Sequence, residues 1–162
     1  MANIKIVTDS SSDIPLSVAH ELGIEVVPMH IVVGYQSYRA GLDITTEQFY
    51  QTMQESRARI TVQPPPVTVF EQLYRRLALE YDHVFSIHLS SRLGANYRLA
   101  QQARAKLPAS SSRVEIIDSK LLSMALGMVV LHAARAVRDG ATPEETAHLI
   151  NILTQHCHLV FF

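Results

Sequence analysis

The order of apolar and polar segments along the chain predicts strands that alternate with helices. Short apolar runs rich in β-branched residues predict strands at residues 4–8, 26–33, 84–89 and 114–117. Each run is followed by a polar loop and a helix-start signal. Strands that alternate with helices form right-handed βαβ units, so the pattern predicts an α/β fold. We expect an open, mainly parallel sheet with helices on both faces.

Capping boxes that begin at Thr45 and Thr142, together with prolines and glycines, indicate where the helices begin and end. The predicted helices cover residues 15–22, 46–56, 68–80, 95–107 and 121–138, and another begins at Pro143. A hairpin is expected at residues 34–38, and the prolines at 64–66 require an extended segment before them. The final apolar run at residues 159–162 predicts one more strand. Either this strand lies at a sheet edge, or the sequence is the first half of a longer protein.

Length and composition restrict the class of protein. The chain has 162 residues, 48% of them hydrophobic, which suits one folded domain. Its 14 Lys and Arg residues balance 15 Asp and Glu residues, so the sequence lacks the excess of basic residues that is typical of nucleic-acid-binding proteins. The single Cys157 forms no internal disulfide, and no signal-peptide pattern opens the chain, so we expect a cytoplasmic protein. Polar residues interrupt the apolar stretch at 121–137, which favours a buried helix over a membrane span.

Three loops at the ends of predicted parallel strands are rich in hydroxyl groups. They lie at residues 8–12, 90–91 and 118–119, and the segment 61–64 is expected to join them at one rim. Ligands of open parallel sheets bind at this edge, where helix N-termini and hydroxyls suit a carboxylate or phosphate. The alternative is that these residues only cap helices, which is their usual role.

The same loops carry a resemblance to a known family. Residues 7–15, with the sequence VTDSSSDIP, look like the opening motif of the DegV family of bacterial fatty-acid-binding proteins. The TVQP sequence at 61–64 resembles the family's Thr-Ser-Gln-Pro motif, and SSRLGANY at 90–97 resembles its Ser-Ser-x-Leu-Ser-Gly-Thr-Tyr turn. Asp118 and Ser119, with Gly127, resemble a later element. The likeness covers essentially the whole chain.

The resemblance implies both an architecture and a function. Members of the family have two α/β domains, and residues 1–162 resemble only the first, so the second domain is expected to be absent. Members bind a long-chain fatty acid, with its carboxylate at the domain interface, and present it to a separate kinase. The resemblance therefore implies a fatty acid and a fatty-acid kinase as partners, and no enzymatic activity, cofactor or metal.

The resemblance and the rim argument together select the candidate binding residues. By position, Thr61 matches the motif threonine that binds the head group, whereas Gly94 stands where the family has a serine. The candidate head-group residues are Thr61, Ala95, Asn96, Ser10 and Ser91. For the lipid tail, Met124 and Met128 lie one turn apart on an apolar helix and are adaptable enough to contact a flexible chain. The alternative is that this helix binds no ligand and only packs in the hydrophobic core between the sheet and a neighbouring helix.

Other constellations give weaker signals. His156, Cys157 and His158 are adjacent, and neighbours on a strand point to opposite faces, which disfavours a metal site. His88 near Ser90 suggests a base beside a nucleophile, but no Gly-x-Ser-x-Gly elbow or phosphate-binding glycine loop occurs.

Two alternatives to lipid binding stay open: a shortened paralogue that acts as a protein-association module, and a small phosphotransferase-related enzyme. The resemblance also implies that the face covered by the family's second domain is apolar and exposed here. We therefore predict self-association, most simply as a two-fold homodimer, through that face or the terminal run at 159–162.

Overall fold

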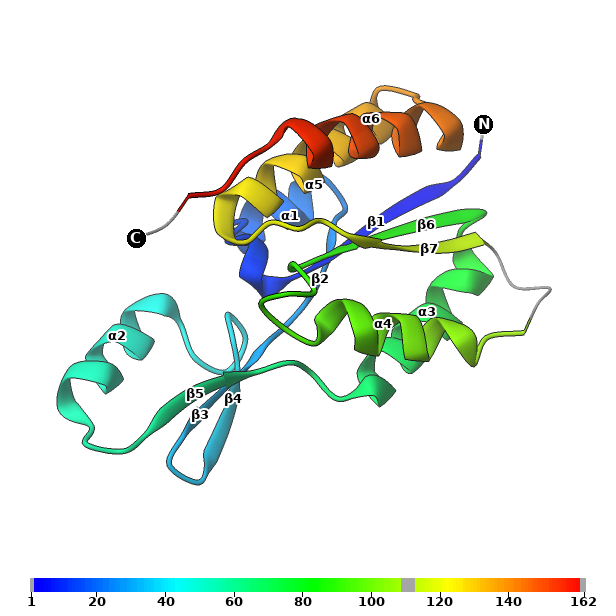
Figure 1. Ribbon diagram of the computed structural model, residues 1–162. Helices are drawn as coiled ribbons and strands as arrows, with labels where there is room; N and C mark the ends of the chain where they lie inside the picture. The colour runs from blue at the N-terminus through cyan, green and yellow to red at the C-terminus, as the bar shows by residue number, and fades with distance from the viewer. Residues whose placement is uncertain (1, 109–112, 161–162) are drawn as a thin grey trace.

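A computed structural model describes residues 2–108 and 113–160 of the chain (Figure 1). Its strands are β1 (Ile4–Asp9), β2 (Glu25–Val27), β3 (His30–Val33), β4 (Gln36–Arg39), β5 (Ile60–Gln63), β6 (His83–His88) and β7 (Arg113–Asp118). Its helices are a short 3-10 helix η1 (Ser10–Ser12) and α1 (Leu16–Glu21), α2 (Thr46–Glu55), α3 (Val67–Glu80), α4 (Asn96–Ala105), α5 (Ser123–Arg138) and α6 (Pro143–His156).

Four of the strands form the main sheet, in the order β2-β1-β6-β7, and all neighbours are parallel. Helices α1, α5 and α6 cover one face, and α3 and α4 cover the other (Figure 1). The predicted α/β fold with helices on both faces is therefore confirmed. In particular, β6 and β7, the strands predicted at 84–89 and 114–117, pair in parallel as this fold requires.

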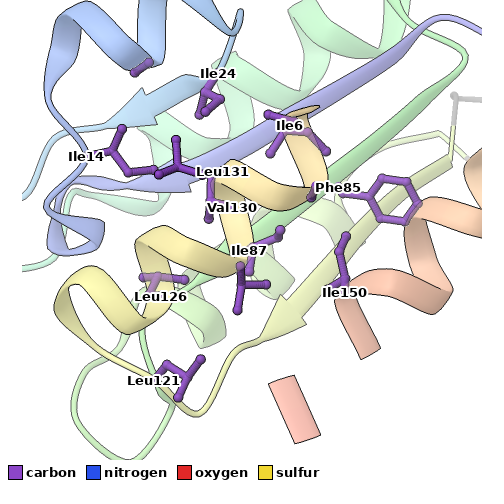
Figure 2. Packing of buried hydrophobic residues seen from close by; sticks show 14 of the residues in the cluster. Ile6, Ile14, Ile24, Phe85, Ile87, Leu121, Leu126, Val130, Leu131 and Ile150 are labelled. Carbon is purple, nitrogen blue, oxygen red and sulfur yellow. The ribbon is translucent and has the colours of Figure 1, made fainter. Parts of the chain in front are cut away.

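The core on the α5 face is built from aliphatic side chains around Phe85 and Val130 (Figure 2). Helix α5 reaches this position only because Gly127 has no side chain. A Cβ atom at Gly127 would lie 2.4 Å from the backbone oxygen of Ser12. The close approach fixes η1, and with it the loop after β1, against the start of α5.

One predicted strand is wrong as a single element. The run at residues 26–33 divides into β2, which joins the main sheet, and β3, which belongs to a second sheet. Pro28 lies at the break, where its missing N–H group cannot continue the pairing with β1. Strand β3 instead pairs antiparallel with β4, through the predicted hairpin, and with β5.

The second sheet and helix α2 form a projecting unit, here called the arm, at residues 30–63 (Figure 1). Helix α2 begins with the predicted capping box of Thr45 and Gln48, but none of its residues is buried. Within β3, β4 and β5 only Ile31 is buried. The arm therefore makes little core of its own.

The C-terminal segment differs from its prediction. Helix α6 ends at His156, and residues 157–160 follow it without forming a strand. The rest of the strand predicted at 159–162 lies outside the described residues.

Candidate functional site

The carboxylate of Asp9 is the centre of a buried polar cluster at the carboxyl edge of the main sheet. The pairing of Thr8 with Ile87 brings Asp9, the last residue of β1, beside His88 at the end of β6. Its Oδ2 atom lies 2.9 Å from His88 Nδ1 and accepts from the backbone N–H of Leu89 at 3.2 Å. Its Oδ1 atom accepts from the backbone and hydroxyl of Ser11. Asp9 thus ties the loop after β1 to the loop after β6.

The environment of Asp9 favours its ionised form. Burial by itself would raise the pKa of this carboxyl group. The hydrogen bond and charge of His88, together with hydrogen bonds from the Ser11 and Asn96 side chains, outweigh that effect and hold the pKa below its usual value. The buried Asp9 carboxylate is therefore a fixed negative charge beneath the loops that carry the predicted site.

His88 continues the cluster into the core. Because a carboxylate only accepts hydrogen bonds, Nδ1 of His88 donates to Asp9. Nε2 of His88 lies 2.7 Å from the hydroxyl of Ser86, which is 2.8 Å from the hydroxyl of Tyr74. The side chains of Asp9, Ser86, His88 and Tyr74 are all completely buried. His88 therefore bonds to Ser86 and not to Ser90, the serine that the sequence placed beside it, and no substrate in solvent can reach the buried Ser86.

A cavity of about 340 Å³ lies between these loops and the arm. The loop after β1 contributes Ser10 and Ser11, and Asn96 stands at the first turn of α4. The other lining residues are apolar or lack a polar side chain: Met29, Ile31, Ala40, Phe49, Val62, Pro64, Leu89, Leu93, Gly94 and Leu122. The cavity is therefore an apolar space with a few polar groups at one end, the usual composition of a lipid or small-molecule site.

Asn96 is the most unusual polar group in the cavity wall. The residue is completely buried, and its Oδ1 atom accepts no hydrogen bond from any described residue. Its Nδ2 atom lies 3.0 Å from the sulfur of Met29. Buried polar atoms are nearly always paired in folded proteins, so this unpaired oxygen beside the cavity is an exception.

Leu89 occupies the space where the related motif has a serine side chain. A Cβ atom at Gly94 would lie 2.6 Å from Cδ2 of Leu89. Both residues line the cavity. The absence of a hydroxyl at position 94 therefore goes together with an apolar side chain that fills its place.

The structure brings some of the predicted head-group residues together and separates others. Ser10 and Asn96 line the cavity, and Ala95 directly precedes α4. Ser91 turns to the surface, where its hydroxyl donates to Asp118 at 2.5 Å. Thr61 is partly buried on β5, next to the cavity-lining Val62. Since neighbouring strand residues face opposite sides, the Thr61 side chain lies on the other face of the small sheet.

The methionines predicted to contact the lipid tail lie elsewhere. Met124 is 39% exposed and Met128 is 43% exposed on the outer side of α5. Neither lines the cavity beside Asn96. Met128 instead borders a groove of about 300 Å³ between α5 and α6, together with Ile152 and Cys157.

Sequence reasoning missed the apolar half of the cavity. Ile31, Phe49 and Val62 come from three elements of the arm, far apart in sequence, and no motif joins them. The alternation of side chains between the two faces of β3 and β5 partly indicates which of their residues line the cavity. Ile31 and Val62 are direct partners in the antiparallel ladder and so face the same side.

Three further findings concern residues 2–108 and 113–160 only. Within them, no group of three His, Cys, Asp or Glu side chains could hold a metal ion. His156 ends α6, where its Nδ1 atom bonds the Ile152 carbonyl, and Cys157 caps the helix, so the strand expected around them is not formed. No helix in the same residues is long and apolar enough to cross a membrane.

Comparison with known sequences identifies the family. The profile described as "Uncharacterised protein, DegV family" matches residues 3–162. The chain belongs to the DegV family. A DegV domain-containing protein of Caldanaerobacter subterraneus is 39% identical over 145 residues, which is 90% of this chain and 51% of that protein. A DegV domain-containing protein of Lactococcus lactis is 34% identical over 156 residues, which is 96% of this chain and 55% of that protein.

Solved structures of DegV proteins have the same fold. DegV from Bacillus subtilis, described as a fatty acid binding protein, matches with a TM-score of 0.89 and 28% identity over 96% of this chain and 55% of that one. A DegV family protein from Thermus thermophilus, described by its fatty acid binding, matches with a TM-score of 0.84 and 31% identity over 94% of this chain and 54% of that one. This DegV chain spans about half the length of the relatives it matches.

Proposed function

We propose that this DegV chain binds a long-chain fatty acid or a similar lipid in the cavity between the main sheet and the arm. The head group lies at the carboxyl edge of the sheet, near Ser10, Asn96 and the first turn of α4. The acyl chain lies against Ile31, Phe49 and Val62. The observation that carries the proposal is the cavity itself, which is apolar on the arm side and polar only where the loops after β1 and β6 meet. The fatty acid binding described for the structural relatives supports it.

The proposed activity is binding rather than catalysis. Ser86 and His88, which have the residue types of a nucleophile and a base, are completely buried and bond to Tyr74 and Asp9. As the resemblance implies, the bound lipid would be presented to a partner kinase. Leu93 and Gly94 of the cavity wall follow directly on the exposed Ser91 and Arg92, and this exposed loop is the surface that a partner would contact beside the head group.

The test is a titration of the purified protein with a fluorescent fatty acid, and mass spectrometry of lipid extracted from it. Val62 lines the cavity and is 58% exposed, so Val62→Trp fills the cavity at little cost in folding. We expect this variant to lose at least tenfold in affinity. Val160→Trp, at an exposed position outside the cavity, is the matched control and is expected to bind as the wild type does. Equal affinities for both variants would contradict the proposed site.

A second candidate function is protein association, possible without any lipid. The arm exposes Tyr35, Leu42, Tyr50 and Met53, and where such side chains adjoin they form the kind of apolar surface that usually marks a partner site. A two-fold homodimer through the arm is the simplest arrangement. Light scattering at micromolar concentration tests it, and a monomer that carries lipid would favour the first function alone.

A further inference from the structure

Met29 joins the arm to the loops of the main sheet. It lies between β2 and β3, directly before the arm, and is 8% exposed. Its backbone N–H donates to the hydroxyl of Ser10 at 2.9 Å, and its sulfur lies 3.0 Å from Nδ2 of Asn96. Its carbonyl accepts the backbone N–H of Ala40 at 2.8 Å. Met29 and Ala40 flank the hairpin of β3 and β4, so one residue connects both ends of this hairpin to η1 and α4.

Leu16 makes a second contact with the arm, at the turn that follows Ala40. Gly41 begins this turn with a positive φ of 77°, and its N–H donates to the Ile44 carbonyl at 3.0 Å. A Cβ atom on Gly41 would lie 3.4 Å from Cδ1 of Leu16, so the Leu16 side chain packs against the turn. Leu16 is the first residue of α1 and does not line the cavity. The arm is therefore held from outside the cavity as well as from within it.

The other hydrogen bonds of the arm are internal to it. Among the described residues, every remaining side-chain or loop hydrogen bond of residues 30–63 joins two residues of the arm itself. The arm also buries few side chains. Segments held by few contacts move at low free energy. The position of the arm against the main sheet thus depends largely on Met29 and Leu16.

A lipid in the cavity would contact both sides of this connection. Ser10 lines the cavity from the main sheet, Met29 and Ala40 line it at the connection, and Phe49 and Val62 line it from the arm. A ligand that touches both sides gains more contacts when the arm lies against the main sheet, so it stabilises that position. Binding linkage is reciprocal, so contacts that hold the arm in this position strengthen lipid binding.

We propose that Met29 and Leu16 are positioning residues of the lipid site. They hold the arm in the position that binds a fatty acid, and the bound fatty acid in turn fixes the arm against the main sheet. This inference rests on the proposed lipid-binding function. Leu16 gives the sharper test, because it lies outside the cavity and can affect the ligand only through the arm.

The first experiment compares Leu16→Ala with Ile152→Ala in a titration with a fluorescent fatty acid. Both residues are aliphatic, lie on helices of the main region outside the cavity, and have similar exposed fractions of 47% and 40%. We expect Leu16→Ala to lose about fivefold in affinity, and Ile152→Ala to bind as the wild type does. The denaturant midpoints of both variants should stay close to that of the wild type, which excludes global unfolding as the cause.

The second experiment measures the position of the arm directly. Spin labels are placed on Tyr35→Cys at the tip of the hairpin and Leu79→Cys on α3, both exposed positions, in a Cys157→Ser background. We expect saturating palmitic acid to narrow the distribution of distances between the labels. Met29→Ala should broaden the lipid-free distribution. Met29→Leu loses the sulfur but keeps the backbone bonds and most of the volume, so its distribution should lie between those of Met29→Ala and the wild type.

The outcomes separate the inference from the function on which it rests. A wild type that binds the fluorescent fatty acid, but whose label distances are unchanged by palmitic acid, overturns the inference and leaves lipid binding intact. Equal affinities of Leu16→Ala and Ile152→Ala do the same. Should one variant fail to fold, the label distances of the wild type with and without palmitic acid still decide the question. A wild type that binds neither fatty acid overturns the proposed function, and the inference with it.

Discussion

The main sheet and the arm of this DegV chain are held together in different ways. Every residue of β6 is buried, and helices pack on both sides of the sheet. In the arm, α2 buries no residue, and Ile31 is the one buried residue of its three strands. The main sheet therefore has a core of its own, whereas the arm has local hydrogen bonds and only two buried hydrophobic side chains among its described residues, Ile31 and Ile44.

This difference matters because the cavity lies between the two regions. Its polar end, with Ser10 and Asn96, belongs to loops fixed by the buried Asp9 cluster. Its apolar wall, with Phe49 and Val62, belongs to the arm. A head group would thus meet a rigid surface, and an acyl chain would meet one that can adapt. We expect regions with few buried contacts to open at low free energy, which suits a wall that admits a flexible ligand.

The strongest way to test the comparison is to remove one aromatic ring from each region. Phe85→Ala creates a cavity in the main core, and we expect the free energy of unfolding to fall by about 3–5 kcal/mol. Tyr50→Ala in α2 removes a side chain that is 58% exposed, and we expect a change within about 0.5 kcal/mol. Denaturant unfolding measures both, and similar losses would show that the arm shares the core's stability.

The buried and exposed carboxylates provide the next test. Asp9→Asn leaves the donors of one carboxylate oxygen without an acceptor, and we expect a loss of about 1.5–3 kcal/mol at neutral pH. The pKa of Asp9 is lowered in the folded protein, so the ionised form stabilises the fold above the unfolded value near 3.8, and that stability is lost as pH falls through the folded pKa. The wild type should therefore lose its advantage over Asp9→Asn below about pH 4.

The matched control for Asp9 lies in the arm. Asp43 pairs with Arg39 at 2.8 Å, and this ion pair holds the pKa of Asp43 at about 2. Because the pair is exposed, water and salt screen it, and Asp43→Asn is expected to cost far less than Asp9→Asn. Unfolding curves of both variants at pH 3, 4 and 7 would contradict the comparison if the two carboxylates proved equally important.

A third test enlarges a side chain at the junction of the two regions. Gly94→Ser places a Cβ atom 2.6 Å from Leu89 Cδ2, so Leu89 must move, at a cost of about 1–2 kcal/mol. Gly94→Ser with Leu89→Ala should recover fatty-acid affinity relative to Leu89→Ala alone, because the new hydroxyl can then reach a head group. Thermal unfolding and the same probe titration measure the two effects. A single Gly94→Ser variant as stable as the wild type would contradict the close packing.

The sequence predicted best those helices and strands whose start or extent is marked by neighbouring residues alone. The capping boxes at Thr45 and Thr142 placed the starts of α2 and α6 correctly, and the β-branched runs placed β1, β6 and β7. The prediction of a single strand at 26–33 was wrong because apolar residues continue on both sides of Pro28. A run of hydrophobic residues does not show which sheet each half joins. The missing N–H group of Pro28 was the available signal.

The site was harder to predict because it depends on contacts between distant segments. Ser86 and His88 share one face of β6 by simple alternation, but Asp9 meets them only through the parallel pairing of β1 with β6, across 79 positions in sequence. The helical pattern of α5 is apolar nearly all round, so it could not show that Met124 and Met128 face solvent. Asn96 was found from its motif, but its unpaired oxygen appears only when Asp9 and Met29 are placed around it.

The smallest expected effect comes from the two capping boxes, which are chemically alike but lie in different regions. In each, a threonine hydroxyl accepts the backbone N–H three residues on, at 3.2 Å, from Gln48 in α2 and Glu145 in α6. Thr142→Ala should lower the free energy of global unfolding by about 1 kcal/mol, since α6 packs on the core through Ile150. Thr45→Ala should leave global unfolding nearly unchanged, because α2 buries nothing and can open without the main sheet. Hydrogen exchange distinguishes the two cases: the Thr45 variant should speed exchange only within α2. If Thr45→Ala instead lowered global stability as much as Thr142→Ala, the arm would unfold together with the main sheet, and the adaptable wall of the cavity would not exist.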